Sequence, residues 1–491
     1  MNARRIATLL ALACTPMLPL APAQADIDSV LKMLQDTGTD ITPRDEAPLT
    51  LPNTADNGEA PRADRSAFPG STMGRDASPS AAADTWGDAR QQVPRPLAPN
   101  RSDLPWFQTL VDEAPEGSTL KPPAGRYAGP VVIHKALTIE GEGVTIDGGG
   151  KGTVMVLQAS GATLRGLHLT GSGDNHDSDD ACLNVRGNDN VIEHLTVDDC
   201  LFGIDLKAAE RNRIAHTSIR SKPFDLGLRG DSIRLWSSHE NQIVDNRISD
   251  TRDMVAWYSN RNVFARNEAR RSRYSLHFMF ANENLVEDNR FYDNSVGVYV
   301  MYAGYSTIRN NLISHASGAA GMAVGLKEAS DVIIENNEII YCAVGIGSDI
   351  SPFEPDTKVI VRGNRFAYNG IGISFTSDIG GTEVTGNDFD GNLAQIAVGG
   401  AGSATKSLWR GNHWDDYQGF DRNADGVGDT PHELFAFADQ IWMEQPYARF
   451  FKNAPMLEAL DFLERLAPFT SPVLLLRDEA PQYRRKNGSS T

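Results

Sequence analysis

The chain has 491 residues, with 64 Asp and Glu against 46 Lys and Arg, and a formal net charge of −18. This negative charge disfavours nucleic acids and polyanionic polymers as ligands, because like charges repel. Its four cysteines are too few for a disulfide framework, so the fold must depend on its core.

The first 25 residues have the features of a secretory signal. Arg4 and Arg5 precede an apolar run, Ile6–Leu12, and residues 23–25 (AQA) form an A-x-A cleavage site. We expect the exported chain to begin at Asp26, with a charge of −20 rather than −18 once the two arginines are lost. No later apolar run approaches the roughly 18 residues of a membrane-spanning helix.

Residues 26–104 are predicted to form a short helix followed by a linker. The helix covers Asp26–Gly38. The following stretch, 40–103, is rich in Pro, Asp, Ala, Ser and Gly and has almost no aliphatic clusters. Such a composition cannot build a packed core and is typical of an extended or disordered segment.

Residues 105–405 carry a repeat whose marker is Asn-x-apolar. The marker asparagines are 21 to 27 residues apart: Asn246, Asn267, Asn289, Asn311, Asn337, Asn364 and Asn387. A period in the low twenties, with short alternating strands and Gly or Asn corners, predicts an all-β fold. We expect a right-handed parallel β-helix, a solenoid with coils of about 22 residues. The corner Asn should tolerate the left-handed conformation and form a side-chain ladder.

The strand "RYSLHFMF" (Arg273–Phe280) suggests a metal site. Alternation places Leu276 and Phe278 in the core, and His277 and Met279 outside. Stacking by the Asn offsets aligns Leu276 with Val255 and Val298, Phe278 with Trp257 and Val300, Met279 with Met301, and His277 with Tyr299. Met254 falls one coil earlier, at the Ser275 position.

The outward residues Met254, His277, Met279 and Met301 would then form one cluster over three coils. Thioethers and imidazole are soft ligands that suit Cu(I). A methionine row that packs against a loop or a partner protein is the alternative.

A second candidate is a histidine pair. His194 and His216 occur in "NVIEHLTV" and "NRIAHTSI", 22 residues apart, so they should stack in adjacent coils. Repulsion between two imidazolium charges favours a neutral or metal-bound pair. An ordinary polar corner is the competing interpretation. The acidic segment "GDNHDSDDA" (173–181) could likewise bind Ca²⁺, act on a sugar, or simply be a solvated loop.

A third candidate is "DRNADGVGD". Asp421, Asn423, Asp425 and Asp429 occupy positions 1, 3, 5 and 9 of an EF-hand-like loop, with Gly at position 6. Position 12 is His432 rather than Glu, so the bidentate closing ligand is missing. The loop predicts a Ca²⁺ site or, alternatively, a turn held by Asx hydrogen bonds.

Residues 406–491 differ in character from the repeat. An acidic and aromatic loop precedes a predicted helical extension whose apolar residues have helical spacing, namely Met456, Leu457, Leu460 and Leu463. The helix could cap the solenoid or bind a partner. Cys182 and Cys200 could form a disulfide or remain buried thiols.

Four segments together resemble the NosD family of periplasmic maturation factors for nitrous-oxide reductase. They are "RGDSIRLWSS", "DMVAWYSNRN", "RYSLHFMF" and "NHWDDYQGFDRNADGVGDTP", and the resemblance covers roughly residues 105–480. It implies a periplasmic protein that is peripheral at the inner membrane through an ABC transporter with a membrane subunit and an ATPase. It also implies a membrane-anchored copper chaperone as donor of Cu(I), and nitrous-oxide reductase as client.

On this resemblance the His277–Met279 strand handles Cu(I) transiently, and the C-terminal helix docks on the membrane subunit. The family motif does not explain the linker at 40–103. We find no G-x-S-x-G, H-E-x-x-H or P-loop motif, so we expect no catalysis by this chain.

Two alternatives stay open. One is a polysaccharide lyase, epimerase, hydrolase or carbohydrate-binding protein, which would use the Asp clusters and Ca²⁺. The other is a scaffold whose methionine patch contacts a protein without copper.

Overall fold

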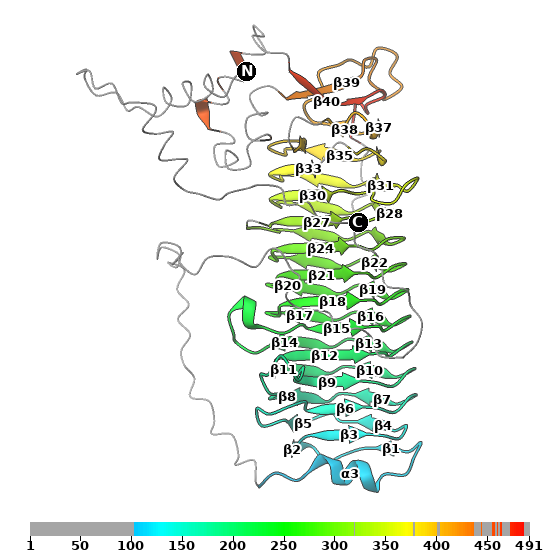
Figure 1. Ribbon diagram of the computed structural model, residues 1–491, viewed down its shortest axis with the longest axis vertical. Coiled ribbons are helices and arrows are strands. Elements are labelled where there is room, and N and C mark those ends of the chain that lie inside the picture. Colours follow the sequence, from blue (N-terminus) through cyan, green and yellow to red (C-terminus); the bar gives the residue numbers. More distant parts are fainter. Residues whose placement is uncertain are drawn as a thin grey trace, which may run out of the picture. The chain divides into compact units, whose positions relative to one another are not determined.

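A computed structural model describes residues 103–318, 320–376, 379–399, 403–436 and 472–485, with residues 443, 454–456, 459, 462 and 463. The expected signal segment and nearly all of the expected linker lie outside the described residues. The described strands form a parallel β-helix of about 13 turns with about 23 residues per turn (Figure 1), which confirms the predicted fold class. Within the described residues, no helix is long and apolar enough to cross a membrane.

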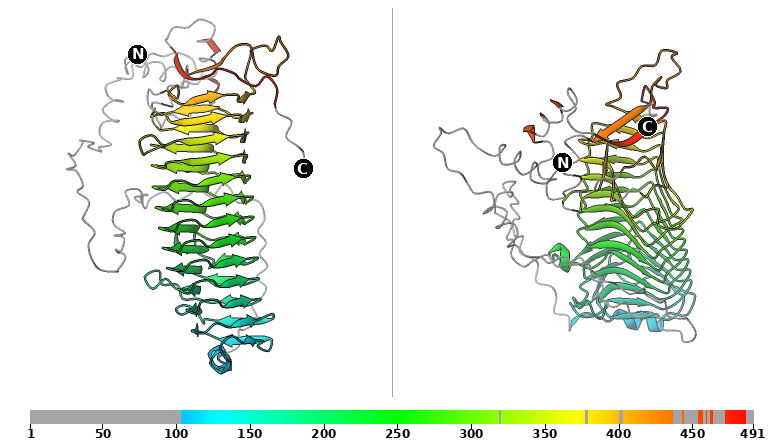
Figure 2. Two further views of the ribbon diagram at one scale, coloured as in Figure 1. Left: turned by 90° about the vertical axis from the view of Figure 1, so that its right-hand side faces the viewer. Right: turned by 45° about the horizontal axis from the view of Figure 1, so that its top comes forward.

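Three parallel sheets run along the column (Figure 2). Each coil contributes one strand to each sheet, except the last described coil, which contributes only to the first two. The first sheet contains β1 (Thr119–Leu120), β4 (Thr138–Glu140), β7 (Thr163–Arg165), β10 (Val191–Glu193), β13 (Arg213–Ala215), β16 (Gln242–Val244), β19 (Val263–Ala265), β22 (Leu285–Glu287), β25 (Thr307–Arg309), β28 (Val332–Glu335), β31 (Val359–Arg362), β34 (Thr382–Thr385) and β37 (Leu408–Arg410).

The second sheet contains β2 (Gly125–Ala128), β5 (Val144–Asp147), β8 (His168–Thr170), β11 (Thr196–Cys200), β14 (Ser218–Ser221), β17 (Arg247–Ser249), β20 (Glu268–Arg270), β23 (Arg290–Tyr292), β26 (Leu312–Ser314), β29 (Glu338–Ile340), β32 (Arg365–Ala367), β35 (Asp388–Asp390) and β38 (His413–Trp414).

The third sheet contains β3 (Val131–Ile133), β6 (Met155–Leu157), β9 (Ala181–Val185), β12 (Phe202–Lys207), β15 (Ile233–Trp236), β18 (Asp253–Trp257), β21 (Tyr274–Met279), β24 (Val296–Met301), β27 (Met322–Lys327), β30 (Val344–Asp349), β33 (Ile371–Phe375) and β36 (Ile396–Val398). Its outward face holds the soft residues of β21 and β24 described below.

Both ends of the column are covered. The helix α3 (Phe107–Glu113) packs Phe107 and Val111 against the first coils. At the other end, the antiparallel pair β39 (His432–Ala436) and β40 (Val473–Asp478) contributes Leu475 and Leu476 to the core. Covering the terminal strands protects backbone groups that would otherwise be open to pairing with another chain.

A buried asparagine ladder runs along the corner between the first and second sheets. Each Asn side chain accepts from the backbone N–H and the Nδ2 of its equivalent in the preceding coil, as in Asn267 to Asn289 at 2.8 and 3.1 Å. The ladder continues through the predicted marker residues: Asn246, Asn267, Asn289, Asn311, Asn337, Asn364 and Asn387.

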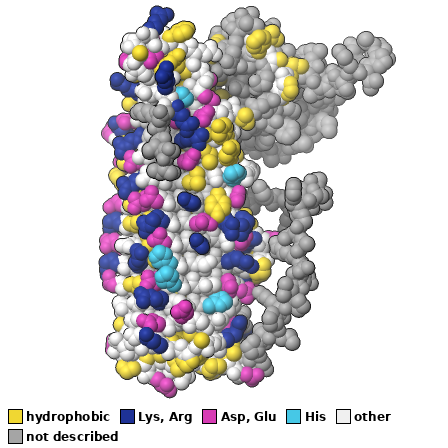
Figure 3. Space-filling view, turned by 180° about the vertical axis from the view of Figure 1, so that it is seen from behind, with side chains coloured by type: hydrophobic (Ala, Val, Ile, Leu, Met, Phe, Trp, Pro, Cys, Tyr) yellow, Lys and Arg dark blue, Asp and Glu magenta, His cyan; other side chains and the backbone are white. Residues whose placement is uncertain are grey.

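The ladder asparagines do not themselves adopt the left-handed conformation, contrary to our expectation. The residue before each of them does, for example Asp245 at φ 58° and Arg266 at φ 53°. Two of these residues pair across adjacent coils, because Arg266 donates to Asp245 at 2.8 Å. Figure 3 shows Lys, Arg, Asp and Glu side chains interspersed along this surface.

Cys182 and Cys200 form a disulfide with Cα atoms 5.6 Å apart, which settles the pairing that the sequence left open. Cys342 is a free, buried thiol, and burial raises its pKa to about 12. This thiol is therefore protonated and unreactive at neutral pH.

Replacing Asn289 by Ala tests the ladder. Asn289 bonds to Asn267, to Asn311 and to the Phe264 carbonyl at 2.9 Å, and its loss leaves several buried groups without partners. At about 1–3 kcal/mol for each such group, the free energy of unfolding should fall by roughly 3 kcal/mol or more. Chemical denaturation measures the change. The exposed neighbour provides a control, since Arg290→Ala should alter stability by less than about 0.5 kcal/mol.

Candidate functional site

The outward face of β21 presents Tyr274, His277 and Met279. Leu276 and Phe278 are fully buried in the core, as alternation predicted. The next strand, β24, repeats the arrangement with an outward Tyr and Met. His277 pairs in register with Tyr299, and Met279 pairs with Met301. These two predicted alignments are confirmed, and neighbouring coils are about 4.8 Å apart.

Trp257 extends this row on the other side, because it pairs in register with Met279. Its ring lies against Trp236 of β15, with centroids 5.0 Å apart. We define the soft row as Trp257, His277, Met279 and Met301. Neither tryptophan was proposed from the sequence as part of the site. The aromatic residues in "IRLW" and "DMVAW" could have been found there by extending the register one coil further.

Met254 does not belong to this row. Its side chain is 1% exposed and packs in the core. The expected positions of Val255 and Trp257 are also wrong, since Val255 pairs with His277 rather than Leu276. The cause is a register shift between Asp253 and Val255, where β18 has five residues and β21 has six. Paired residues of β18 and β21 are 21 positions apart at the start of the strands and 22 positions apart after the register shift.

His277 is held neutral. Burial, reinforced by the positive charge of Arg273, lowers its pKa to about 4. Its ring lies 4.9 Å from that of Tyr274 and 5.8 Å from that of Tyr299. Among the described residues, His277 Nε2 has no hydrogen-bond partner, and the same holds for Trp257 Nε1. Two buried nitrogens without partners therefore occur in adjacent strands beside a methionine pair.

Buried ion pairs lie at, or just before, the start of β15, β18 and β21. Asp253 is 2% exposed and accepts from Arg273 Nε at 3.0 Å. Asp231 is 3% exposed and accepts from Arg252 Nε at 3.0 Å. These pairs fix both arginines near His277, where their positive charge disfavours the imidazolium form.

The histidine pair stacks as expected. The rings of His194 and His216 are 4.9 Å apart and nearly parallel, at 13°. Both residues are exposed at left-handed corner positions. The described residues contain no cluster of three or more His, Cys, Asp or Glu side chains that could hold a metal ion. This pair therefore lacks a third ligand of those types, and a metal there stays a prediction.

Side chains of the acidic segment 173–181 form hydrogen bonds and ion pairs with the rest of the protein. Asp179 accepts from Lys207 at 2.8 Å and from Arg234 at 2.9 Å. Asp180 is 6% exposed and accepts from Ser178 Oγ at 2.7 Å. His176 Nε2 lies 3.2 Å from the Leu228 carbonyl oxygen. The segment is thus a largely exposed loop that is anchored by hydrogen bonds, and Ca²⁺ binding or action on a sugar there stays a prediction.

The EF-hand-like loop is held by Asx-type bonds. Asp421 accepts from the backbone N–H groups of Asp425 and Gly426 at 3.1 and 3.0 Å. Asn423 donates to Asp425 at 2.9 Å, and Asp429 accepts from the Arg422 N–H at 2.8 Å. This is the alternative that the sequence left open, and Ca²⁺ binding there stays a prediction.

The predicted C-terminal helix falls largely outside the described residues, including Leu457 and Leu460. Met456 and Leu463 are described and are half exposed, at 50% and 51%. Their role in binding a partner stays a prediction.

Comparison with known proteins bears on the site. Residues 215–419, which include the soft row, match the family described as periplasmic copper-binding protein (NosD). The chain is 30% identical to the probable ABC transporter binding protein NosD of Pseudomonas aeruginosa over 398 residues, which is 74% of this chain and 87% of that protein. The corresponding protein of Stutzerimonas stutzeri is 29% identical over 178 residues, covering 36% and 37% of the two chains.

Among solved structures, the chain is similar to the A-module of the mannuronan C-5 epimerase AlgE6 of Azotobacter vinelandii. Identity is 15%, the TM-score is 0.49, and the match covers 63% of this chain and 94% of that one. The periplasmic alginate epimerase AlgG matches with 11% identity and a TM-score of 0.40, over 59% and 82% of the chains. Because the Pseudomonas relative is matched over most of its length, the chain belongs to the NosD family.

Proposed function

We propose that this protein carries Cu(I) on the soft row in the periplasm, in association with an ABC transporter. We further propose that it acts as a scaffold, rather than an enzyme, in assembling the copper–sulfide centre of nitrous-oxide reductase. The description of the matched family as copper-binding and the transporter-related names of the relatives support the proposal. Copper is here the cargo of the protein.

The Nε2 of His277, which is buried, neutral and without a partner among the described residues, carries the proposal. A buried polar atom without a partner costs about 1–3 kcal/mol, so the site is incomplete without a further ligand. A metal ion accepts the lone pair of a neutral imidazole, whereas a protonated ring cannot bind it. The low pKa keeps this nitrogen available at every pH near neutrality.

The neighbouring donors fit Cu(I) better than a hard cation. Met279 and Met301 provide two thioethers in adjacent coils, and His277 lies two residues along the strand from Met279. Two sulfurs and one imidazole make a soft donor set without negative charge, which disfavours Ca²⁺ and Mg²⁺. The Trp257 ring beside Met279 adds a π face that attracts a cation.

An exposed aromatic ladder adjoins the soft row. Tyr258, Phe280 and Tyr302 each follow a member of the row in the chain, and their rings stack at 5.3 and 5.1 Å. Tyr258 and Phe280 are 43% and 42% exposed. Exposed aromatic groups in a row are typical of protein contact surfaces. The ladder supports copper transfer by direct contact with a copper-donating protein or with the client.

Cu(I) binding tests the donor set. In an anaerobic titration against a competing chelator, the exported chain should bind one Cu(I) in the soft row. The variant Met279→Leu/Met301→Leu keeps the side-chain volume but removes both sulfurs, and His277→Ala/Met279→Ala removes one ligand of each kind. Both should weaken binding by about tenfold or more, equivalent to about 1.4 kcal/mol.

The control variant His194→Ala/His216→Ala removes the exposed histidine pair instead. It should leave the Cu(I) affinity unchanged. Equal affinity in the wild-type protein and both soft-row variants would contradict the assignment. Loss of Cu(I) binding in the control variant would instead assign the copper site to the histidine pair.

The pH dependence provides a separate test. Because protons compete with copper for His277 only near its pKa of about 4, the affinity should stay constant between about pH 7 and about pH 5. An ordinary imidazole with a pKa of 6.5 would instead lose affinity steadily below that pH. The same titration at several pH values, corrected for protonation of the chelator, distinguishes the two profiles. A loss of Cu(I) affinity with its midpoint near pH 6.5 would contradict a buried His277 with a lowered pKa.

A further inference from the structure

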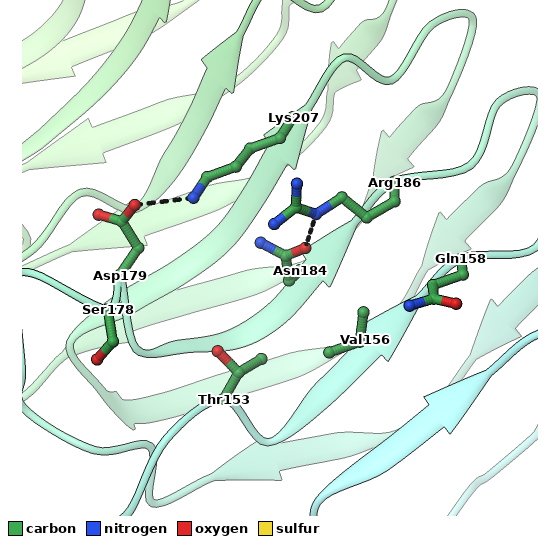
Figure 4. A pocket seen from close by; sticks show the side chains of 8 residues that line it. All are labelled: Thr153, Val156, Gln158, Ser178, Asp179, Asn184, Arg186 and Lys207. Carbon is green, nitrogen blue, oxygen red and sulfur yellow. Dashed lines mark hydrogen bonds and ion pairs between the residues drawn. The ribbon is translucent and has the colours of Figure 1, made fainter. Parts of the chain in front are cut away.

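A polar cavity opens on the outward face of the third sheet, over its early coils. Its volume is about 440 Å³, and its wall is formed by residues of β6, β9 and β12, by residues that flank β6 and β9, and by the acidic segment (Figure 4). All the lining side chains are polar or charged except that of Val156 in β6. The polar lining residues are Thr153, Gln158, Ser178, Asp179, Asn184, Arg186 and Lys207. A cavity of this size is within the range of small-molecule sites, roughly 300–1,000 Å³.

A buried network fixes one side of the cavity. Asp205 is fully buried and accepts from Asn184 Nδ2 at 2.8 Å and from Arg234 Nε at 2.7 Å. Arg234 in turn donates to Asp179 at 2.9 Å, and Lys207 donates to the same carboxylate at 2.8 Å. Burial acts to raise the pKa of Asp179, but the bonds from Arg234 and Lys207 lower it overall, so the carboxylate stays ionised.

Arg186 is the lining cation that has no carboxylate partner among the described residues. Its Nε donates to Asn184 Oδ1 at 2.6 Å, which anchors the guanidinium. Within the described part of the chain, no protein acceptor binds its two Nη groups. Figure 4 shows the guanidinium and the Lys207 ammonium directed toward the same space. The lining therefore carries two cations against one carboxylate, in a chain of strongly negative charge.

We propose that this cavity binds a small hydroxylated carboxylate, the class to which sugar acids belong. A guanidinium with free Nη groups is shaped for two parallel bonds to a carboxylate. The hydroxyl of Thr153 and the amide of Gln158 supply donors and acceptors for ligand hydroxyls, and Ser178 Oγ, which donates to Asp180, can accept from one. The excess positive charge is local, so the net charge of the chain does not exclude a small anion.

The cavity is separate from the soft row. Strand β12 is three coils away from β21 in the third sheet, a distance of roughly 14 Å along the column at about 4.8 Å per coil. Ligand binding at the cavity and Cu(I) binding at the soft row can therefore be measured independently.

Calorimetric titration of the metal-free chain with D-glucuronate, D-glucose, acetate and sulfate tests the proposal. Glucuronate should bind more tightly than glucose, which lacks the carboxylate, and than acetate, which lacks the hydroxyls. Arg186→Gln should weaken glucuronate binding by about tenfold or more, the scale of a lost charge-assisted pair of hydrogen bonds. Arg186→Lys keeps the positive charge but cannot form two parallel hydrogen bonds to a carboxylate, so it should give an intermediate affinity for glucuronate.

The control is Arg247→Gln, which removes an exposed arginine of β17 in the second sheet and should not change the affinity. Circular dichroism confirms that each variant is folded. Equal binding of glucuronate by the wild-type protein and Arg186→Gln would overturn the proposal. Binding of acetate or sulfate as tight as that of glucuronate would overturn the assignment to a hydroxylated ligand. If none of the four probes released or absorbed heat on titration, the proposed binding site itself would be overturned.

Discussion

Each coil of the β-helix is hydrogen-bonded to the next, and this stacking positions every side chain on the surface of the column. Parallel strand pairing fixes the position of each strand residue along the axis of the β-helix. The buried Asn ladder fixes the corner at which each coil turns. A side chain on one strand consequently meets its equivalent about 4.8 Å away. Residues 22 positions apart, such as Met279 and Met301, become neighbours on a rigid surface without any loop to position them.

The outward face of the third sheet uses this rigidity for two different environments. Around β18, β21 and β24 it carries thioethers, aromatic rings and one neutral imidazole. Around β9 and β12 it carries hydroxyls, amides and unbalanced positive charge. Between them, buried ion pairs such as Arg252–Asp231 hold charges at fixed positions. The positive charges of Arg273 and Arg252 help keep His277 unprotonated.

The sequence predicted the column and part of the candidate site. The Asn spacing identified the coils, and the 22-residue offset correctly aligned His277 with Tyr299 and Met279 with Met301. It misplaced Met254, because marker spacing gives the length of a coil but not the position of an extra residue within it. The network of Asp179, Asp205 and Arg234 could not be predicted, since it joins a loop to two strands whose side-chain directions depend on the fold.

X-ray absorption at the copper edge of the Cu(I)-loaded chain would identify the copper ligands, because it reports which atoms bind the metal. We expect two sulfur ligands and one imidazole nitrogen, with the sulfur contribution lost in Met279→Leu/Met301→Leu. A spectrum with only nitrogen and oxygen ligands, or one unchanged in that variant, would contradict copper binding at the soft row.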